Sequence, residues 1–236
     1  VKWLKPYSQG KIKVLYLSYM SRLDDTNKRD VVELNQRLDV DYKFIPLLNK
    51  RGGKGEKGIK GLEPYIVDVA DDELKKGYDV VVVNRLNFKD VQEEFTQDLL
   101  TQVKAGKGLL LIGCKNIPAE ISSTSTRASR VVLPKDFNNM PVVNPKLKDT
   151  SRQVSLLCKI WQLEKGMIST IDERGWLYPS VPALAPGMIE EFYPNYLGRE
   201  IPYWEYKLFP IIKSIVYLSG KVSDIQINGI NSKDEK

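Results

Sequence analysis

Tyr78-Asp-Val-Val-Val-Val-Asn84 is a continuous β-branched run of the kind that is buried on both faces of a parallel sheet. Gly108-Leu-Leu-Leu-Ile-Gly113 is a second buried run. Between them, apolar residues from Lys89 to Ala105 recur at helical spacing, and Gly106 follows as a C-terminal stop. Strand, helix and strand joined by short connections predict a parallel α/β architecture with right-handed crossovers.

The same alternation extends toward the N-terminus. The spacing predicts a strand over Lys11 to Ser18, a helix over Lys28 to Leu38 and a second strand over Val40 to Leu48. A Gly-rich loop follows at residues 50–60, and Ile66 to Leu74 indicates a short connection with a helical turn. The alternation of strands and helices therefore also holds on the N-terminal side of the central run.

The C-terminal half is less regular. Prolines and serines between Cys114 and Asp149 indicate loops and short elements. Ser155 to Trp161 and Gly166 to Ile171 predict a β-hairpin with Gly166 at its turn, followed by a proline-rich loop over residues 179–194. Pro210 predicts the first turn of a last helix, which runs from Ile211 to Leu218 and ends at Gly220.

Composition excludes several classes of protein. The 236 residues are 42% hydrophobic and 28% charged, which is typical of globular chains, and no stretch has the 18 apolar residues of a membrane span. The net charge is +6, but much of the excess lies in the Gly-rich loop without aromatic residues between the charges, which argues against a nucleic-acid partner. We expect one domain over residues 1–222 and a polar tail over 223–236, as an excised piece of a longer polypeptide or a processed chain.

Two cysteines, Cys114 and Cys158, and no histidine limit the chemistry. Cys114 is predicted at a strand end and Cys158 within a second strand. Two cysteines define no disulfide framework and supply too few ligands for zinc. We therefore expect no metal site and no cofactor, and the compartment stays open.

The Tyr78 and Gly108 strands with the Lys104-Ala-Gly-Lys turn between helix and strand resemble class I glutamine amidotransferase-like domains. The hairpin around Gly166 and the segment from Trp204 to Lys213 resemble the non-enzymatic branch of that superfamily. The resemblance covers about four-fifths of the chain. It implies a mostly parallel sheet in a flavodoxin-like three-layer α/β/α fold, with a β-hairpin addition and long loops in the C-terminal half.

In active members of the family, a cysteine lies on a tight turn after this strand, and a histidine and a glutamate complete the catalytic triad. Cys114 matches the position of the nucleophile approximately, but Lys115-Asn116-Ile117 replaces the glycine that lets the next amide form the oxyanion hole. Without a neighbouring base, a thiol keeps a pKa near its reference value of about 8.5, so it is largely protonated at neutral pH. Cys114 is either a nucleophile or its remnant, or a small buried residue at a strand end. Lys115 is a weak substitute base because sequence neighbours on a strand point to opposite faces.

Carboxylates gather at Asp172-Glu173, at Glu190-Glu191 and at Glu205. A pair of them could hydrolyse a glycoside if the fold brought two carboxyl groups to about 5–9 Å. The non-catalytic alternatives are a solvated loop for Glu190-Glu191 and, for Glu205, a role in capping or orienting the segment before the last helix. Among these, Glu205 joins Cys114 as a catalytic candidate.

Aromatic residues are dense in the proline-rich stretch, where they could stack on sugar rings or on a partner protein, or pack that long loop onto the sheet. Arg127 and Arg130 could form an anion site near the strand ends, or could be ordinary solvated side chains. The candidate ligand-binding residues are Arg127, Arg130, Trp176, Tyr203 and Trp204.

The sequence therefore predicts a non-catalytic glutamine amidotransferase-like domain, a pseudoenzyme that serves interaction, oligomerisation or ligand binding within a larger multidomain protein. The resemblance implies neighbouring domains or identical subunits as partners and a carbohydrate-related context. The compartment stays open, with an extracellular or cell-surface place slightly favoured for a larger protein of this kind. The alternative is a Cys114-dependent hydrolase or amidase with an unconventional base. A third reading is a spacer that holds its neighbours apart.

Overall fold

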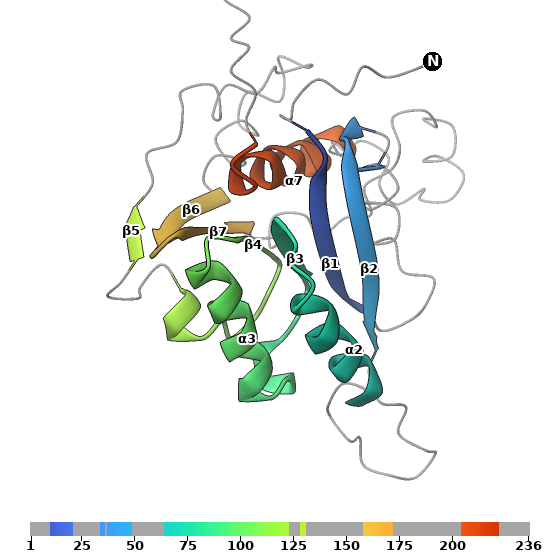
Figure 1. Cartoon of the computed structure of the whole chain (residues 1–236), viewed down its shortest axis with the longest axis vertical. Helices are drawn as coiled ribbons and strands as arrows, with labels where there is room; N and C mark the ends of the chain where they lie inside the picture. The colour runs from blue at the N-terminus through green and yellow to red at the C-terminus, as the bar shows by residue number, and fades with distance from the viewer. Residues whose placement is uncertain are drawn as a thin grey trace, which may run out of the picture.

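A seven-stranded sheet forms the centre of the fold (Figure 1). The computed structural model describes residues 10–20, 34–35, 37–48, 64–122, 128–130, 158–171 and 204–221. Five neighbouring strands are parallel, and the last two alternate in direction. In spatial order they are β2 (Val40–Leu48), β1 (Ile12–Met20), β3 (Val80–Asn84), β4 (Gly108–Ile112), β7 (Gly166–Ile171), β6 (Cys158–Leu163) and β5 (Ala128–Arg130).

Helices cover both faces of this sheet. Two helices, α2 (Pro64–Leu74) and α3 (Glu93–Lys104), lie on one face, and α7 (Trp204–Leu218) lies on the other (Figure 1). Short 3-10 turns at Phe88–Asp90 and Ala119–Ile121 extend the connections after β3 and β4. The mostly parallel, three-layer α/β/α fold predicted from the sequence is confirmed.

The core is divided by the sheet into two clusters. Alternate residues of β1 and β3 face α2 and α3, for example Leu15 and Val83, which pack with Phe95 of α3. The intervening residues, such as Val82, pack with Ile215 of α7. All ten residues of β3 and β4 are buried. Each fully buried Val or Leu side chain stabilises the fold by about 1.5–3 kcal/mol, so these two strands anchor both layers.

The hairpin between β6 and β7 is confirmed, but its turn lies earlier than predicted. Residues Glu164 and Lys165 form the turn, and Gly166 is already paired with Leu163 as the first residue of β7. Glu164 adopts the positive φ of 54° that the turn needs. Gly166 is required for another reason: a Cβ there would lie 2.5 Å from the carbonyl oxygen of Lys107 and closer still to that of Val103. Close backbone packing against the end of α3, rather than turn geometry, explains this glycine.

The last helix is also longer than predicted. It begins at Trp204, so Pro210 lies inside it rather than in its first turn, while Gly220 ends it with a φ of 68°. Proline removes one helical hydrogen bond. We attribute the tolerance of Pro210 to the apolar face of Ile211 and Ile215, which is buried against the sheet.

The remaining predicted elements lie partly inside and partly outside the described residues. The turn expected at Ile66 to Leu74 is the full helix α2, and the helix expected from Lys89 begins at Glu93. Of the helix predicted over 28–38, residues 34, 35 and 37 are described and helical. The loop at 50–60, most of the irregular region to 149, the proline-rich loop and the tail lie outside the described residues. The single-domain assignment stays a prediction.

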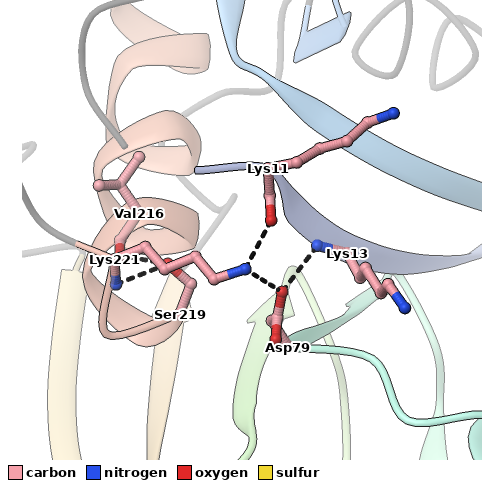
Figure 2. A network of polar contacts seen from close by, with 6 residues as sticks. All are labelled: Lys11, Lys13, Asp79, Val216, Ser219 and Lys221. Carbon is pink, nitrogen blue, oxygen red and sulfur yellow. Dashed lines mark hydrogen bonds and ion pairs between the residues drawn. The ribbon is translucent and has the colours of Figure 1, made fainter. Parts of the chain in front are cut away.

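A polar network ties the end of α7 to the amino ends of the central strands (Figure 2). Lys221 donates through Nζ to Asp79 Oδ2 at 2.8 Å and to the backbone oxygen of Lys11 at 2.5 Å. Asp79 Oδ2 also accepts the backbone N–H of Lys13 at 2.8 Å. Ser219 completes the corner, because its hydroxyl donates to Val216 O and accepts the N–H of Lys221. These contacts fix the end of α7 to the amino ends of β1 and β3.

Candidate functional site at the carboxyl edge of the sheet

The carboxyl ends of β1, β3 and β4 form the part of this fold where a ligand or substrate is expected. From β1 the chain passes to β2 on one side and later to β3 on the other, so the direction of winding reverses between β1 and β3. Open α/β sheets bind ligands outside the carboxyl ends of their strands at such a point. Asn84 ends β3 beside Ser18 of β1 and Ile112 of β4.

Cys114 lies at this edge, two residues after β4. Its Sγ donates to the backbone oxygen of Val83 at 3.2 Å, with Ile112 O at 3.7 Å. The side chain is partly buried and packs against the core cluster on the α3 side of the sheet. The predicted strand-end position is confirmed, and the thiol is turned back toward the strands β3 and β4.

The backbone around Cys114 is bonded to the segment that follows β3. Lys115 donates its N–H to Leu86 O at 2.9 Å, and Lys115 O accepts the N–H of Phe88 at 3.0 Å. Asn87 pairs with Lys115 in a parallel bridge, and Asn116 donates through Nδ2 to Asn87 Oδ1 at 2.8 Å. The amide that would follow a nucleophile at Cys114 therefore already has a backbone acceptor.

Among the described residues at this edge, two that are not glycine adopt left-handed backbone. Arg85, directly after β3, has a φ of 57°, and Asn116 has a φ of 50°. Left-handed backbone is unfavourable for a long side chain such as arginine, and such strain is concentrated at functional sites. The N–H of Arg85 donates to Ile112 O at 2.7 Å, which holds the turn in place.

A second polar group lies on the opposite face of the same edge. Tyr16, Ser18 and Asn84 are 1%, 0% and 0% exposed on the α7 side of the sheet. Asn84 donates through Nδ2 to the Tyr16 hydroxyl at 3.0 Å. Sequence reasoning did not select these residues. The signal was present, because Ser18 and Asn84 are polar positions that end otherwise apolar strand runs at the point where the winding reverses.

Of the other predicted site residues, the structure describes the backbone positions of Arg130, Trp204 and Glu205. Arg130 ends β5, and two strands, β6 and β7, separate β5 from β4. Trp204 and Glu205 are the first two residues of α7, so Glu205 belongs to the last helix and not to a segment before it. Arg127, Trp176, Tyr203 and the carboxylate pairs at 172–173 and 190–191 lie outside the described residues.

The described part of the chain contains no cluster of metal-ligand side chains and no membrane-spanning helix. Within it, no three side chains of the histidine, cysteine, aspartate and glutamate types come together as metal ligands. Among its helices, none is both long enough and apolar enough to cross a bilayer.

Comparison with known proteins gives a match to a solved structure at low sequence identity. No protein-family model matches the chain, and no curated protein matches it. Among solved structures it is similar to the cytoplasmic protein STM3548 of Salmonella typhimurium, at 12% sequence identity and a TM-score of 0.45, over 86% of this chain and 98% of that one. A likeness at this level concerns the course of the backbone, and we take no activity, site or partner from it.

Proposed function

We propose that this chain is a non-catalytic glutamine amidotransferase-like domain that serves interaction, oligomerisation or ligand binding within a larger multidomain protein. The proposal is supported by the hydrogen bonds that the Cys114 thiol and the next backbone N–H make. The thiol donates to Val83 O, and the N–H of Lys115 donates to Leu86 O. Both groups that a cysteine nucleophile would need are engaged with backbone oxygens.

The first consequence concerns the nucleophile. Carbonyl oxygens carry partial negative charge, so Val83 O and Ile112 O facing Sγ favour the neutral thiol over the thiolate. The thiolate is the reactive form of cysteine. The sequence also contains no histidine that could take the thiol proton.

The second consequence concerns transition-state stabilisation. An oxyanion hole needs donors aimed at the position of the developing charge, and loss of one donor costs about 10²–10³ in rate. The N–H of Lys115 is committed to Leu86 O at 2.9 Å. Lys115 and Asn116 cannot copy the glycine turn of the active family without giving up this bond.

The proposal is tested by the rate of iodoacetamide alkylation of Cys114 as a function of pH. A Cys158→Ser variant leaves Cys114 as the one thiol, and the Cys114→Ser/Cys158→Ser double variant gives the background. We expect slow alkylation that accelerates only above about pH 8, as for an ordinary or shielded thiol. Fast alkylation whose rate has already reached its plateau near pH 6 would show an activated thiolate. That result would favour a Cys114-dependent hydrolase or amidase.

A further inference from the structure

Ser18 and Asn84 are buried polar residues whose hydrogen-bonding capacity is not used up within the described fold. They are register partners on β1 and β3, and both are 0% exposed. Neither Ser18 Oγ nor Asn84 Oδ1 makes a hydrogen bond to any residue that the structure describes. Unpaired buried polar atoms lower stability, and native proteins keep few of them.

A second buried serine on the same face of the sheet shows the contrast. Ser169 of β7 is also 0% exposed, and its Oγ lies 3.4 Å from Ser214 Oγ of α7. There the fold supplies a partner on α7. Ser18, like Ser169, lies two residues before the end of its strand, but its neighbour on β3 is Asn84, the last residue of that strand. It therefore lies at the reversal point between β1 and β3, where α/β sheets bind ligands.

The chemistry of the group is neutral. Tyr16 and Ser18 contribute hydroxyls and Asn84 an amide, and the Asn84–Tyr16 hydrogen bond of 3.0 Å fixes the amide in position. Burying a charged ligand group against uncharged partners would carry a large desolvation cost. If the amide were rotated by half a turn, Nδ2 would take the place of Oδ1, so the matching group must be able to donate and to accept. Hydroxyl and amide groups do both.

We propose that Ser18 and Asn84, with Asn84 held by Tyr16, form the base of a binding site for a neutral hydroxyl or amide group of a small polar ligand. This inference deepens the proposed non-catalytic function by naming the chemistry of the ligand. It differs from the cysteine position because Cys114 packs on the α3 side of the sheet, whereas Tyr16 belongs to the cluster on the α7 side. Arg85, the residue directly after Asn84, adds a strained left-handed backbone at the same edge of the sheet.

The first test compares Ser18→Ala with Ser169→Ala in thermal unfolding of the ligand-free protein. The two variants make the same change at equally buried strand positions. If Ser18 Oγ is kept for a ligand, its removal relieves an unpaired atom and raises Tm by about 1–3 °C, while Ser169→Ala lowers Tm by a similar amount. A loss of Tm in Ser18→Ala equal to that in Ser169→Ala would overturn the proposal, because Ser18 would then have a structural partner.

The second test measures binding with D-glucose and myo-inositol as hydroxyl probes and acetamide as the amide probe. We expect at least one probe to raise Tm of the wild-type chain, and its apparent Kd to weaken about tenfold in Ser18→Ala but not in Ser169→Ala. The probe that binds identifies hydroxyl or amide as the source of the hydrogen bonds. If no probe distinguishes the wild-type chain from Ser18→Ala, the site is overturned. The alkylation of Cys114 is independent of both tests, so failure of this inference and failure of the non-catalytic proposal give different results.

Discussion

Lys221 and Asp79 form a partly buried ion pair that joins the end of α7 to the start of β3, with Nζ and Oδ2 2.8 Å apart. Their side chains are 30% and 24% exposed. Partial burial alone would raise the pKa of Asp79, but the hydrogen bonds from Lys221 and from the Lys13 backbone outweigh burial and lower that pKa below its ordinary value. The folded state therefore stabilises the charged carboxylate.

We expect Asp79→Asn to lower the free energy of unfolding by about 1 kcal/mol at pH 7, because the amide cannot replace the charge-assisted hydrogen bonds. The contribution of a carboxylate with a depressed folded pKa is complete above the unfolded pKa and is lost as pH falls through the folded pKa. The difference between wild type and variant in urea unfolding should therefore shrink below about pH 4.

Asp72→Asn provides the matched control for that experiment. Asp72 lies 3.8 Å from Lys75, but the two side chains are 78% and 66% exposed. Exposed pairs contribute about 0–1 kcal/mol, so this variant should unfold like the wild type. Equal losses in the two variants would contradict a specific role for Lys221 and Asp79.

Tyr78 supports a carboxylate that is almost fully buried. Its hydroxyl donates to Glu73 Oε2 at 2.7 Å, and Lys76 donates to Glu73 Oε1 at 2.6 Å. The hydrogen bond from Lys76, followed by that from Tyr78, lowers the pKa of Glu73, while burial and then the bond to Glu73 raise the pKa of Tyr78. Glu73 is 8% exposed, so the loss of one donor should matter.

We expect Tyr78→Phe to lower the free energy of unfolding by about 1–2 kcal/mol at pH 7. Because the folded pKa of Tyr78 lies above the unfolded value near 10, its contribution is present below that pH and is lost as pH rises. Urea unfolding at pH 7 and at pH values above 10 would show a steeper alkaline loss in the wild type than in Tyr78→Phe. Tyr42→Phe, at an edge-strand residue that is 37% exposed, should change neither curve.

The parts of the fold that the sequence predicted are those governed by burial. The β-branched run ending at Asn84 and the glycine-bounded run starting at Gly108 are central strands because continuous apolar segments must be covered on both faces. Local signals were less reliable where tertiary packing overrides them. Pro210 suggested a helix start, yet the helix extends through it, and Gly166 suggested a turn but serves a close backbone contact.

The candidate site was predicted less well than the fold. Cys114 was selected by its resemblance to a nucleophile, and its strand-end position is confirmed. Its hydrogen bond to Val83 O depends on how β3 and β4 lie side by side, which no sequence pattern encodes. Ser18 and Asn84 are far apart in the chain, and they become neighbours only when the parallel register of β1 and β3 is known.

The environment of Asp71 disfavours the charged form of its carboxylate. Burial, followed by repulsion from Asp98 of α3, raises the pKa of Asp71, and its Oδ1 has no hydrogen-bond partner within the described structure. We expect Asp71→Asn to raise the free energy of unfolding by about 0.5–1 kcal/mol at pH 7. A raised folded pKa means that stability is lost as pH rises through it, so the gain should shrink as pH falls toward 4.

A double-variant cycle checks the cause. If repulsion between Asp71 and Asp98 contributes, the gains of Asp71→Asn and Asp98→Asn in urea unfolding will sum to more than the gain of the combined variant. Additive gains would exclude repulsion from Asp98 and leave burial of Asp71, with repulsion from Asp68 and Asp72, as the cause.

Gly166→Ala tests the close contact between β7 and the end of α3. Its Cβ would be forced against the backbone oxygens of Val103 in α3 and of Lys107 in the short connection before β4. We expect a loss of about 2–3 kcal/mol in the free energy of unfolding or failure to fold. Gly77→Ala is the comparison, because nothing lies within 4 Å of its Cβ and its φ of 78° alone should cost about 1–2 kcal/mol. A loss at Gly166 no larger than that at Gly77 would contradict the steric explanation.

The contact between Lys221 and Lys11 joins the segment before the first strand of the sheet to the segment after the last described helix. The backbone oxygen of Lys11, just before β1, accepts from Lys221 Nζ at 2.5 Å, although the two residues are 210 positions apart in the chain. One lysine side chain thus bridges parts of the sequence that are remote from each other, and it holds β1 and α7 together at one corner of the sheet.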